Sequence, residues 1–396
     1  MRRHRSLFVI TILFLFSISN AGAKDINVHG FLSQGVIYTT DNNYYGKSSD
    51  VSYEHREYGI NLHYEIRDCS YLSFQLISKE AGDMYSSELE FDYIYVNQIL
   101  HDSSSTQTRG HFGKIKPPIG LYNETREAPT ARSGIWMPQV IYVEGLGLRE
   151  YYTGIDGMSI SHDRFERDTL IKADIAISIP QDLDDKAQAA FLGSIFEGDL
   201  SMDLGAVARV QIDPMASNTL YSITYIGSRT TYEQADTNDP LDDGDVTVNT
   251  LILSTETNLN RFRWINEGVA RYIDTDGFGD SFNDDTRTEA GFYTELRFIP
   301  SSTYELFTRY EMLYRDISDR DGSEFSQRAD LAKHRAYQHQ IGVGALWNLT
   351  DNWQLRAEAH RVRGTALTPI SDNPEFTEGG GERDWNKFGL QMTFSF

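Results

Sequence analysis

The chain ends in the stretch Asn386–Phe396, NKFGLQMTFSF, whose residues alternate strictly in character. The apolar residues share one parity: Phe388, Leu390, Met392, Phe394 and Phe396. Successive side chains of a β-strand point to opposite faces, so the alternation predicts a strand with one apolar and one polar face. A chain that stops on such a strand, with phenylalanine as its last residue, leaves an edge that needs a partner.

The same period of two recurs along most of the chain. It is clearest in these segments: Tyr58–Arg67, Ile171–Ile177, Ala290–Phe298, Tyr304–Tyr314 and Trp353–His360. No charged residue falls on their apolar parity, although 24% of the chain is charged. Because a charge on the lipid face of a barrel costs roughly 2–4 kcal/mol at the membrane midplane, this pattern favours strands whose apolar face meets lipid.

Aromatic residues near the strand ends separate a membrane barrel from a soluble β-sandwich, which would also alternate. Tyrosines and tryptophans stand near the predicted ends at Tyr58, Tyr95, Tyr304, Tyr314, Trp347 and Trp353. Such amphipathic rings form girdles at headgroup level in membrane barrels, whereas a sandwich would pack Val, Ile and Leu on its inner face. We therefore predict an all-β transmembrane antiparallel barrel.

The connections between the strands predict their number. Long and short gaps alternate, as in bacterial barrels with long outer loops and short periplasmic turns. Counting residues 78–87 and 117–150 among the long gaps gives sixteen strands, with fourteen and eighteen as alternatives. A closed barrel has no free edges, which explains how a chain with a single cysteine is held together without disulfides.

The N-terminus predicts export. Residues 1–23 combine an arginine-rich opening, an apolar stretch and the small residues Ala21, Gly22 and Ala23. This pattern is typical of a secretory signal peptide, followed by a barrel domain over residues 24–396; a signal anchor is the alternative, although the apolar stretch is short for a spanning helix. The net charge of −22 excludes a nucleic-acid binder, whose surface would be basic.

Both ends of the barrel domain resemble those of Gram-negative outer-membrane porins. The last strand, ending in Phe396, looks like the signal that is recognised by the barrel-assembly machinery. The stretch VHGFLSQGV, residues 28–36, is similar to the first strand of porins. The resemblance implies an outer-membrane location, a water-filled channel for small hydrophilic solutes or ions, and a homotrimer. No catalytic constellation stands out in the sequence, so we expect neither enzyme activity nor a cofactor.

The stretch over residues 110–142 carries the most specific resemblance, to the passage into loop 3 of phosphate-selective and DcaP-like porins. There a G-x-F/K-x-P-x-G strand end leads into a loop with arginines, and the matching basic residues here are Lys114, Lys116, Arg126 and Arg132. Proline cannot donate to a strand ladder, so Pro117 and Pro118 end the strand. The loop is also apolar, which favours a loop that folds inward and forms a constriction; an outer cap is the alternative.

The polar parities supply the opposite wall of this predicted constriction. Arg297, Arg309 and Arg356 lie on them, whereas Glu124 and Glu127 interrupt the basic residues of loop 3. We predict that the three arginines face the two glutamates, because such charge rows set ion preference in pores. The alternative is a set of scattered ion pairs that stiffen the wall.

Other functions find weaker support in the sequence. The acidic loop with Asp274, Asp276 and Asp280 resembles a calcium loop, but the residue types at its fifth and twelfth places do not fit, so a solvated loop is favoured. Acidic loops could also bind divalent ions that bridge lipopolysaccharide. The remaining alternatives are a barrel with a closed lumen, used as an adhesin or structural protein, and an interfacial enzyme. The enzyme would need Ser and His on the lipid-facing wall, and the lipid-facing parity contains no histidine.

Overall fold

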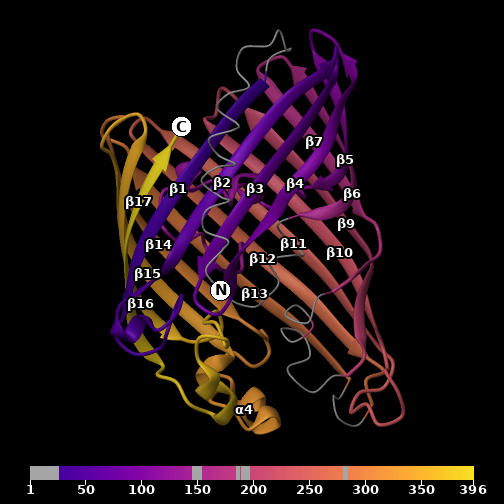
Figure 1. Cartoon of the computed structure of the whole chain (residues 1–396), viewed down its shortest axis with the longest axis vertical. Helices are drawn as coiled ribbons and strands as arrows, with labels where there is room; N and C mark the ends of the chain where they lie inside the picture. Colours follow the sequence, from indigo (N-terminus) through magenta and orange to yellow (C-terminus); the bar gives the residue numbers. More distant parts are fainter. Residues whose placement is uncertain (1–25, 145–153, 184–187, 189–196, 280–283) are drawn as a thin grey trace, which may run out of the picture.

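A computed structural model shows one antiparallel β-sheet closed into a barrel (Figure 1). The structure describes residues 26–144, 154–183, 188, 197–279 and 284–396. The sheet has sixteen long strands, and a two-residue strand, β8, continues the line of β7 along β9. The predicted fold and strand number are confirmed. The signal peptide lies outside the described residues and stays a prediction.

The strands follow one another around the barrel in chain order. The first half consists of β1 (Ile26–Thr39), β2 (Ser52–Arg67), β3 (Ser70–Ala81), β4 (Tyr85–Asp102), β5 (Thr106–Ile115), β6 (Ile155–Glu166), β7 (Thr169–Ser178) and β8 (Gln181–Asp182). The second half consists of β9 (Asp199–Pro214), β10 (Thr219–Glu233), β11 (Gly244–Leu259), β12 (Phe262–Asp276), β13 (Asp285–Phe298), β14 (Tyr304–Tyr314), β15 (Tyr337–Asn348), β16 (Trp353–Gly364) and β17 (Asp384–Ser395).

The C-terminal strand finds its partner in the first strand. β17 pairs with β1 in antiparallel register from Phe31 opposite Ser395 to Thr39 opposite Lys387. The backbones of Gly30 and Phe396 exchange two hydrogen bonds of 3.0 Å. These bonds satisfy main-chain groups of Gly30 and Phe396, and the pairing of β17 with β1 closes the barrel.

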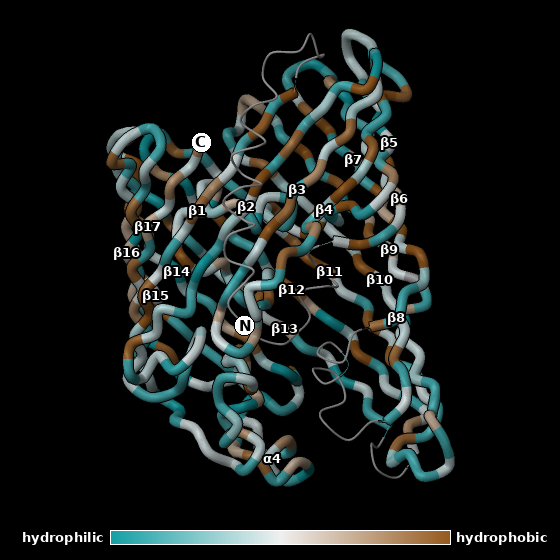
Figure 2. The backbone as a smooth tube through the Cα atoms, in the orientation of Figure 1, coloured by the Kyte–Doolittle hydropathy of each residue, from teal (hydrophilic) through white to brown (hydrophobic). Residues whose placement is uncertain are grey.

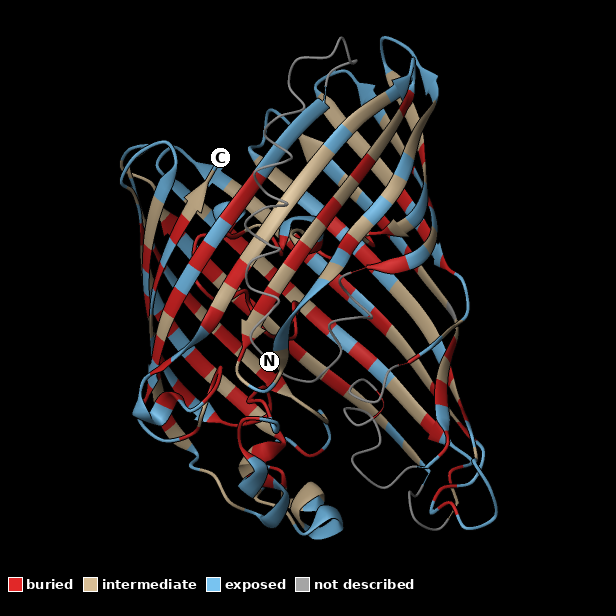
Figure 3. Cartoon of the chain, viewed as in Figure 1, coloured by how far each residue is buried: buried red, intermediate tan, exposed pale blue. Residues whose placement is uncertain are grey.

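The wall is apolar outside and polar inside. On β17 the side chain of Leu390 is 49% exposed, whereas its neighbour Gln391 is 1% exposed. Buried and exposed residues alternate in this way along the strands (Figure 3), and brown and teal alternate along the tube in Figure 2. A soluble protein buries its apolar residues, so this reversed pattern is that of a barrel whose outer face meets lipid.

The connections differ in length between the two ends of the barrel. One end, the turn end, carries short turns and the C-terminus; the other, the loop end, carries the long loops and the short helix α4 (Ser323–Ala329). In the described parts of the loop-end connections lie the short helical turns η1 (Ser48–Asp50), η4 (Lys333–Arg335) and η5 (Pro374–Glu378). No helix in the described ranges is long and apolar enough to cross a membrane.

Two local expectations were wrong. Residues 78–87 do not form a long loop, because β3 extends to Ala81 and β4 begins at Tyr85. In addition, the ladder between β3 and β4 pairs Phe91 with Leu76 and Tyr93 with Gln75, leaving Asp92 as an extra residue. This β-bulge reverses the parity, so Tyr95 packs against loop 3 inside the barrel instead of joining a girdle.

Candidate functional site: loop 3 in the barrel lumen

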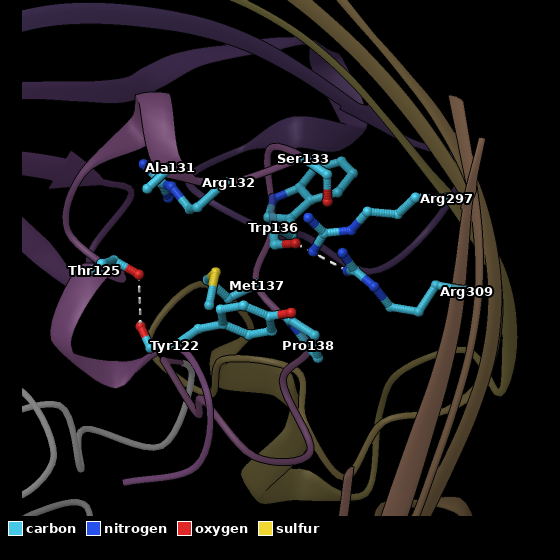
Figure 4. Close-up of a pocket in the computed structure, with 11 residues that line it drawn as sticks. Tyr122, Thr125, Ala131, Arg132, Ser133, Trp136, Met137, Pro138, Arg297 and Arg309 are labelled. Carbon is cyan, nitrogen blue, oxygen red and sulfur yellow. Dashed lines mark hydrogen bonds between the residues drawn. The ribbon is translucent and has the colours of Figure 1, made fainter. Parts of the chain in front are cut away.

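Loop 3 follows β5 and folds into the lumen, as predicted. Pro117 and Pro118 end the strand, and the chain then forms two short helical turns, η2 (Asn123–Thr125) and η3 (Pro129–Ala131). Figure 4 shows the middle of the loop lying beside β13 and β14, with Trp136 next to Arg309. Residues 117–144 of loop 3 are described, and most of their side chains are buried inside the barrel.

One side of loop 3, the apolar flank, packs on strands β9 to β14. Met137, Val140, Ile141 and Tyr142 belong to the same buried cluster as apolar side chains of the inner wall. The wall contributes Val207, Ile252, Ile265, Val269, Tyr293 and Leu313. The inner face of the barrel is otherwise polar, but it presents apolar side chains where loop 3 contacts it. Burial of these side chains stabilises the position of the loop.

A glutamate stands at the centre of this apolar flank. Glu267 of β12 accepts hydrogen bonds from the hydroxyls of Tyr142 and Tyr293, each at 2.7 Å. It also accepts from Ser254 at 2.7 Å and from the backbone N–H of Leu121 at 3.0 Å. A buried carboxylate is tolerated when hydrogen bonds surround it, and these bonds join both ends of loop 3 to the wall.

The opposite side of loop 3, the ionic flank, is held by charges. Lys79 of β3 lies 3.0 Å from Glu144, 3.7 Å from Glu127 and 3.8 Å from Glu57. Arg132 donates to both carboxylate oxygens of Glu57 of β2, at 2.8 and 2.7 Å. All five side chains are buried, so each charge depends on its partners rather than on water.

The pKa values of two loop residues on the ionic flank, Glu144 and Arg132, follow from this arrangement. Burial alone would raise the pKa of Glu144, but Lys79 and Arg126 outweigh it and lower the pKa to about 2. Burial alone would lower the pKa of Arg132, but Glu57 outweighs it and raises the pKa. Both groups are therefore charged at neutral pH.

The three predicted wall arginines pair differently from the prediction. Arg297 and Arg309 form ion pairs with Glu295, and Arg309 donates to the carbonyl of Trp136 at 2.9 Å. Arg356 donates to the carbonyls of Pro129 and Arg132, at 2.6 and 3.2 Å. The predicted opposition to Glu124 and Glu127 is therefore wrong. Arg309 and Arg356 lie deep in the wall and hold the backbone of loop 3.

The two predicted glutamates have other partners. Glu124 binds Arg209 of β9, which donates to it at 2.6 Å and also pairs with Asp174 of β7 at 2.8 Å. Glu127 lies on the ionic flank beside Lys79. Of the two, only Glu124 is open to the lumen, with a side chain 39% exposed. The charges that sequence reasoning placed on one eyelet thus belong to separate clusters.

The four basic residues of the porin-like stretch are also dispersed. Lys116 pairs with Asp92 at 2.8 Å. Arg126 donates to the carbonyls of Tyr142 and Val143 at 3.4 and 3.3 Å. Lys114 shares the outward parity of Phe112, so it points away from loop 3 and its prediction as a lumen residue was wrong. Arg132, on the ionic flank, is the fourth.

Sequence reasoning missed the wall residues that matter most for loop 3. Lys79, Glu57, Glu267 and Arg209 were not singled out as site residues, although all lie on the polar parity of their strands. For Glu57, Glu267 and Arg209 that parity was the available signal, whereas Lys79 stood in the predicted gap over residues 78–87. The parity could not rank these residues, because their partners on loop 3 are 48 (127 − 79) to 146 residues away in sequence.

The candidate calcium loop gains no further support. Asp274 accepts a hydrogen bond from Thr286 at 2.9 Å, and Asp280 lies outside the described residues. Among the described residues, no group of three or more His, Cys, Asp or Glu side chains could hold a metal ion.

Comparisons with known proteins place the fold. No protein-family model and no curated protein matches the sequence, but solved structures match it over nearly its whole length. The outer membrane channel DcaP of Acinetobacter baumannii superposes with a TM-score of 0.58 at 12% identity, covering 96% of this chain and 99% of that chain. The fold is that of outer-membrane porins.

Two further structures agree with this result. An anion-selective porin from Comamonas acidovorans has a TM-score of 0.58 at 12% identity, covering 94% of this chain and 99% of that chain. Salmonella typhi OmpF, solved in complex with daunomycin, has a TM-score of 0.55 at 10% identity, covering 94% of this chain and 98% of that chain. At such identities the likeness establishes the fold, and function has to be argued from the residues of this chain.

Proposed function

We propose that this protein is an outer-membrane porin, through which small hydrophilic solutes or ions diffuse passively. One observation carries the proposal: a barrel with an apolar outer face encloses a charged lumen that is narrowed by an inward-folded loop. An apolar exterior suits the membrane, and a polar interior suits water and solutes. By the same reasoning the loop end faces outward and the turn end faces the periplasm.

The side of the lumen near Glu124 is the proposed passage. Between loop 3 and the wall at Arg297 and Arg309, the cavity measures only about 10 Å³ (Figure 4), about the size of one water molecule. Solutes therefore need another route. Glu124 and the partly exposed Lys172 carry charges that are not fully buried, so they are positioned to act on passing ions.

Planar-bilayer recording of the refolded protein under a KCl gradient tests this proposal. Stepwise openings are expected, in groups of three if the protein forms the homotrimer that the porin resemblance implies. The sign of the reversal potential shows which ion passes preferentially. A folded, heat-modifiable barrel that never conducts would contradict the proposal.

A barrel with a closed lumen is the second candidate, and one observation favours it. Loop 3 is bound to both sides of the lumen, by apolar packing on β9 to β14 and by ion pairs to β2 and β3. Such a barrel would act as an adhesin or structural protein. Binding to a host or matrix ligand in the absence of conductance would support it.

We propose that the protein is not an enzyme. The lipid-facing parity does contain a histidine, contrary to the sequence analysis: His339 lies on β15 in line with the exposed Ile341. Its Nδ1 lies 3.0 Å from the hydroxyl of Tyr310. A barrel lipase would need a serine in that place, so hydrolysis of a phospholipid ester by this barrel would overturn the proposal.

The proposed porin function also implies partners in the cell envelope. Phe396 ends a strand of alternating apolar and polar residues, which suits recognition by the barrel-assembly machinery. Lipid and lipopolysaccharide surround the proposed barrel, and no nucleic acid or cofactor is expected.

A further inference from the structure

Two arginines on the outer face of the barrel stand apart from the other rim charges. Arg361 and Arg363 lie near the loop end of β16, and both side chains are exposed. Their parity is that of Ala357 and Ala359, opposite to the buried His360, so they point away from the lumen. They therefore lie on the face that meets the membrane or its headgroups.

Other outward arginines at the loop end are neutralised by carboxylates. Arg56 of β2 forms an ion pair with Glu80, and Arg229 of β10 pairs with Asp245 at 2.7 Å and with Asp203 at 3.8 Å. Neither Arg361 nor Arg363 makes an ion pair within the described part of the chain. The side-chain partner of Arg361 is the amide oxygen of Asn386, at 3.3 Å.

One carboxylate on this face, that of Asp384, is already engaged. Asp384 of β17 stands opposite Arg363 in the ladder, but its side chain pairs with Arg383 at 2.6 Å. Arg361, Arg363 and Arg383 thus stand beside one aspartate, which pairs with Arg383 alone of the residues that the structure describes and leaves a local charge of +2 (three minus one) in a chain whose net charge is −22. A local positive excess on an acidic protein attracts anions specifically at that point.

Aromatic and aliphatic side chains fix the height of this site in the membrane. His339 stands opposite Arg363 and lies among Tyr310, Tyr314 and Tyr337, with ring centroids 5.3 to 6.5 Å away. Further toward the turn end, the exposed face becomes apolar: Ile341, Val343, Phe388 and Leu390. Aromatic rings mark the headgroup level, so the arginines lie where acyl chains give way to headgroups.

The outer face thus changes from arginines through aromatic rings to aliphatic side chains. From this order we propose that Arg361, Arg363 and His339, here called the rim patch, bind the phosphate groups of a lipid A-type glycolipid in the outer leaflet. The acyl chains lie on the aliphatic face below, and the phosphates accept hydrogen bonds from the guanidinium groups. The orientation of the barrel rests on the proposed function, but binding requires no conductance. The contact is direct and needs no divalent ion.

Binding of purified lipid A to the refolded barrel in a zwitterionic detergent, with EDTA present, tests the rim patch. Arg361→Gln combined with Arg363→Gln is expected to weaken binding roughly thirtyfold, at about 1 kcal/mol for each lost cation. Arg361→Lys with Arg363→Lys keeps the charge and is expected to retain most of the affinity. Arg229→Gln removes an outward but paired arginine and is expected to leave the affinity unchanged.

Several outcomes would overturn the rim patch. The first is equal binding of lipid A to the wild type and to the double glutamine variant. The second is undiminished binding of dephosphorylated lipid A. The third is full competition by millimolar inorganic phosphate, which would indicate a site for free anions. Heat-modifiability on gels verifies that each variant is folded. Conductance of the same samples separates the two proposals. A barrel that binds lipid A through these arginines but does not conduct would contradict the proposed porin function and leave the rim patch supported.

Discussion

The two flanks of loop 3 are bound to the barrel wall by different interactions, apolar packing on one side and ion pairs on the other. On the apolar flank, Met137, Val140 and Ile141 pack on inner-wall side chains around the hydrogen-bonded Glu267. On the ionic flank, Lys79 lies between three carboxylates, and Arg132 binds Glu57. Apolar packing is insensitive to pH, whereas buried ion pairs depend on every partner keeping its charge. The ionic flank is therefore the side on which the loop can be released.

A charge placed in the apolar flank should have the largest effect. Ile141→Asp puts an unpaired carboxylate into a buried apolar cluster, which should cost several kcal/mol and detach the loop. We expect single-channel conductance to rise several-fold and the unfolding temperature to fall. Ile141→Val, which should cost only about 0.5–1.5 kcal/mol, is the matched control. Unchanged conductance in a folded Ile141→Asp barrel would contradict the role assigned to this flank.

Removal of the central cation should have the next largest effect. Lys79→Met leaves Glu57, Glu127 and Glu144 without their shared partner, and breaking such a buried cluster costs about 3–5 kcal/mol. We expect lower thermal stability and frequent conductance fluctuations. Lys172→Met is the control, since Lys172 is partly exposed and lies 4.0 Å from Asp174, so it should cost less than about 1 kcal/mol. Equal effects of the two variants would refute the distinction.

Acid should loosen the ionic flank and spare the apolar one. The pKa of Glu144 in the folded protein, about 2, lies below its ordinary value of 4.5. Its stabilising contribution, on the order of 3 kcal/mol, is therefore complete above pH 4.5 and is lost as the pH falls toward 2. Unfolding temperature measured against pH should show this loss. In Glu144→Gln the fall in unfolding temperature at low pH should be smaller. An acid profile identical to that of the wild type would contradict the role assigned to Glu144.

Neutralising Glu124 should have the smallest effect on stability. Glu124→Gln removes a partly exposed partner of Arg209, which keeps Asp174, so the cost should stay below about 1 kcal/mol. The reversal potential under a KCl gradient should nevertheless shift toward anions, because a negative charge leaves the proposed passage. Glu127→Gln, on the buried ionic flank, should show the converse: a clear loss of stability and little change in selectivity.

The alternation of residue types was enough to predict the barrel, because it depends only on neighbours two residues apart. The strand number followed from the gaps, and inward folding of loop 3 followed from its apolar residues. Errors arose where a single local event changed the pattern. One extra residue at Asp92 reversed the parity of Tyr95, and longer strands removed the predicted loop over residues 78–87.

The charge partners could not be predicted in the same way. Arg297, Arg309 and Arg356 were expected to face Glu124 and Glu127 because both groups were assigned to the lumen. A lumen position fixes the face of a strand but not the height or the neighbour. Arg309 pairs with Glu295 and donates to the carbonyl of Trp136. The strand register and the path of loop 3 determine these two partners.

The sequence by itself determined a barrel closed between its first and last strands, with an apolar exterior and a polar lumen. These features follow from a period of two and from the need to satisfy every backbone group in lipid. Only the tertiary structure decided which charges hold loop 3 and that Lys114 and His339 face outward. It also left Arg361 and Arg363 without a carboxylate partner in the described chain, because such pairings depend on register between distant strands.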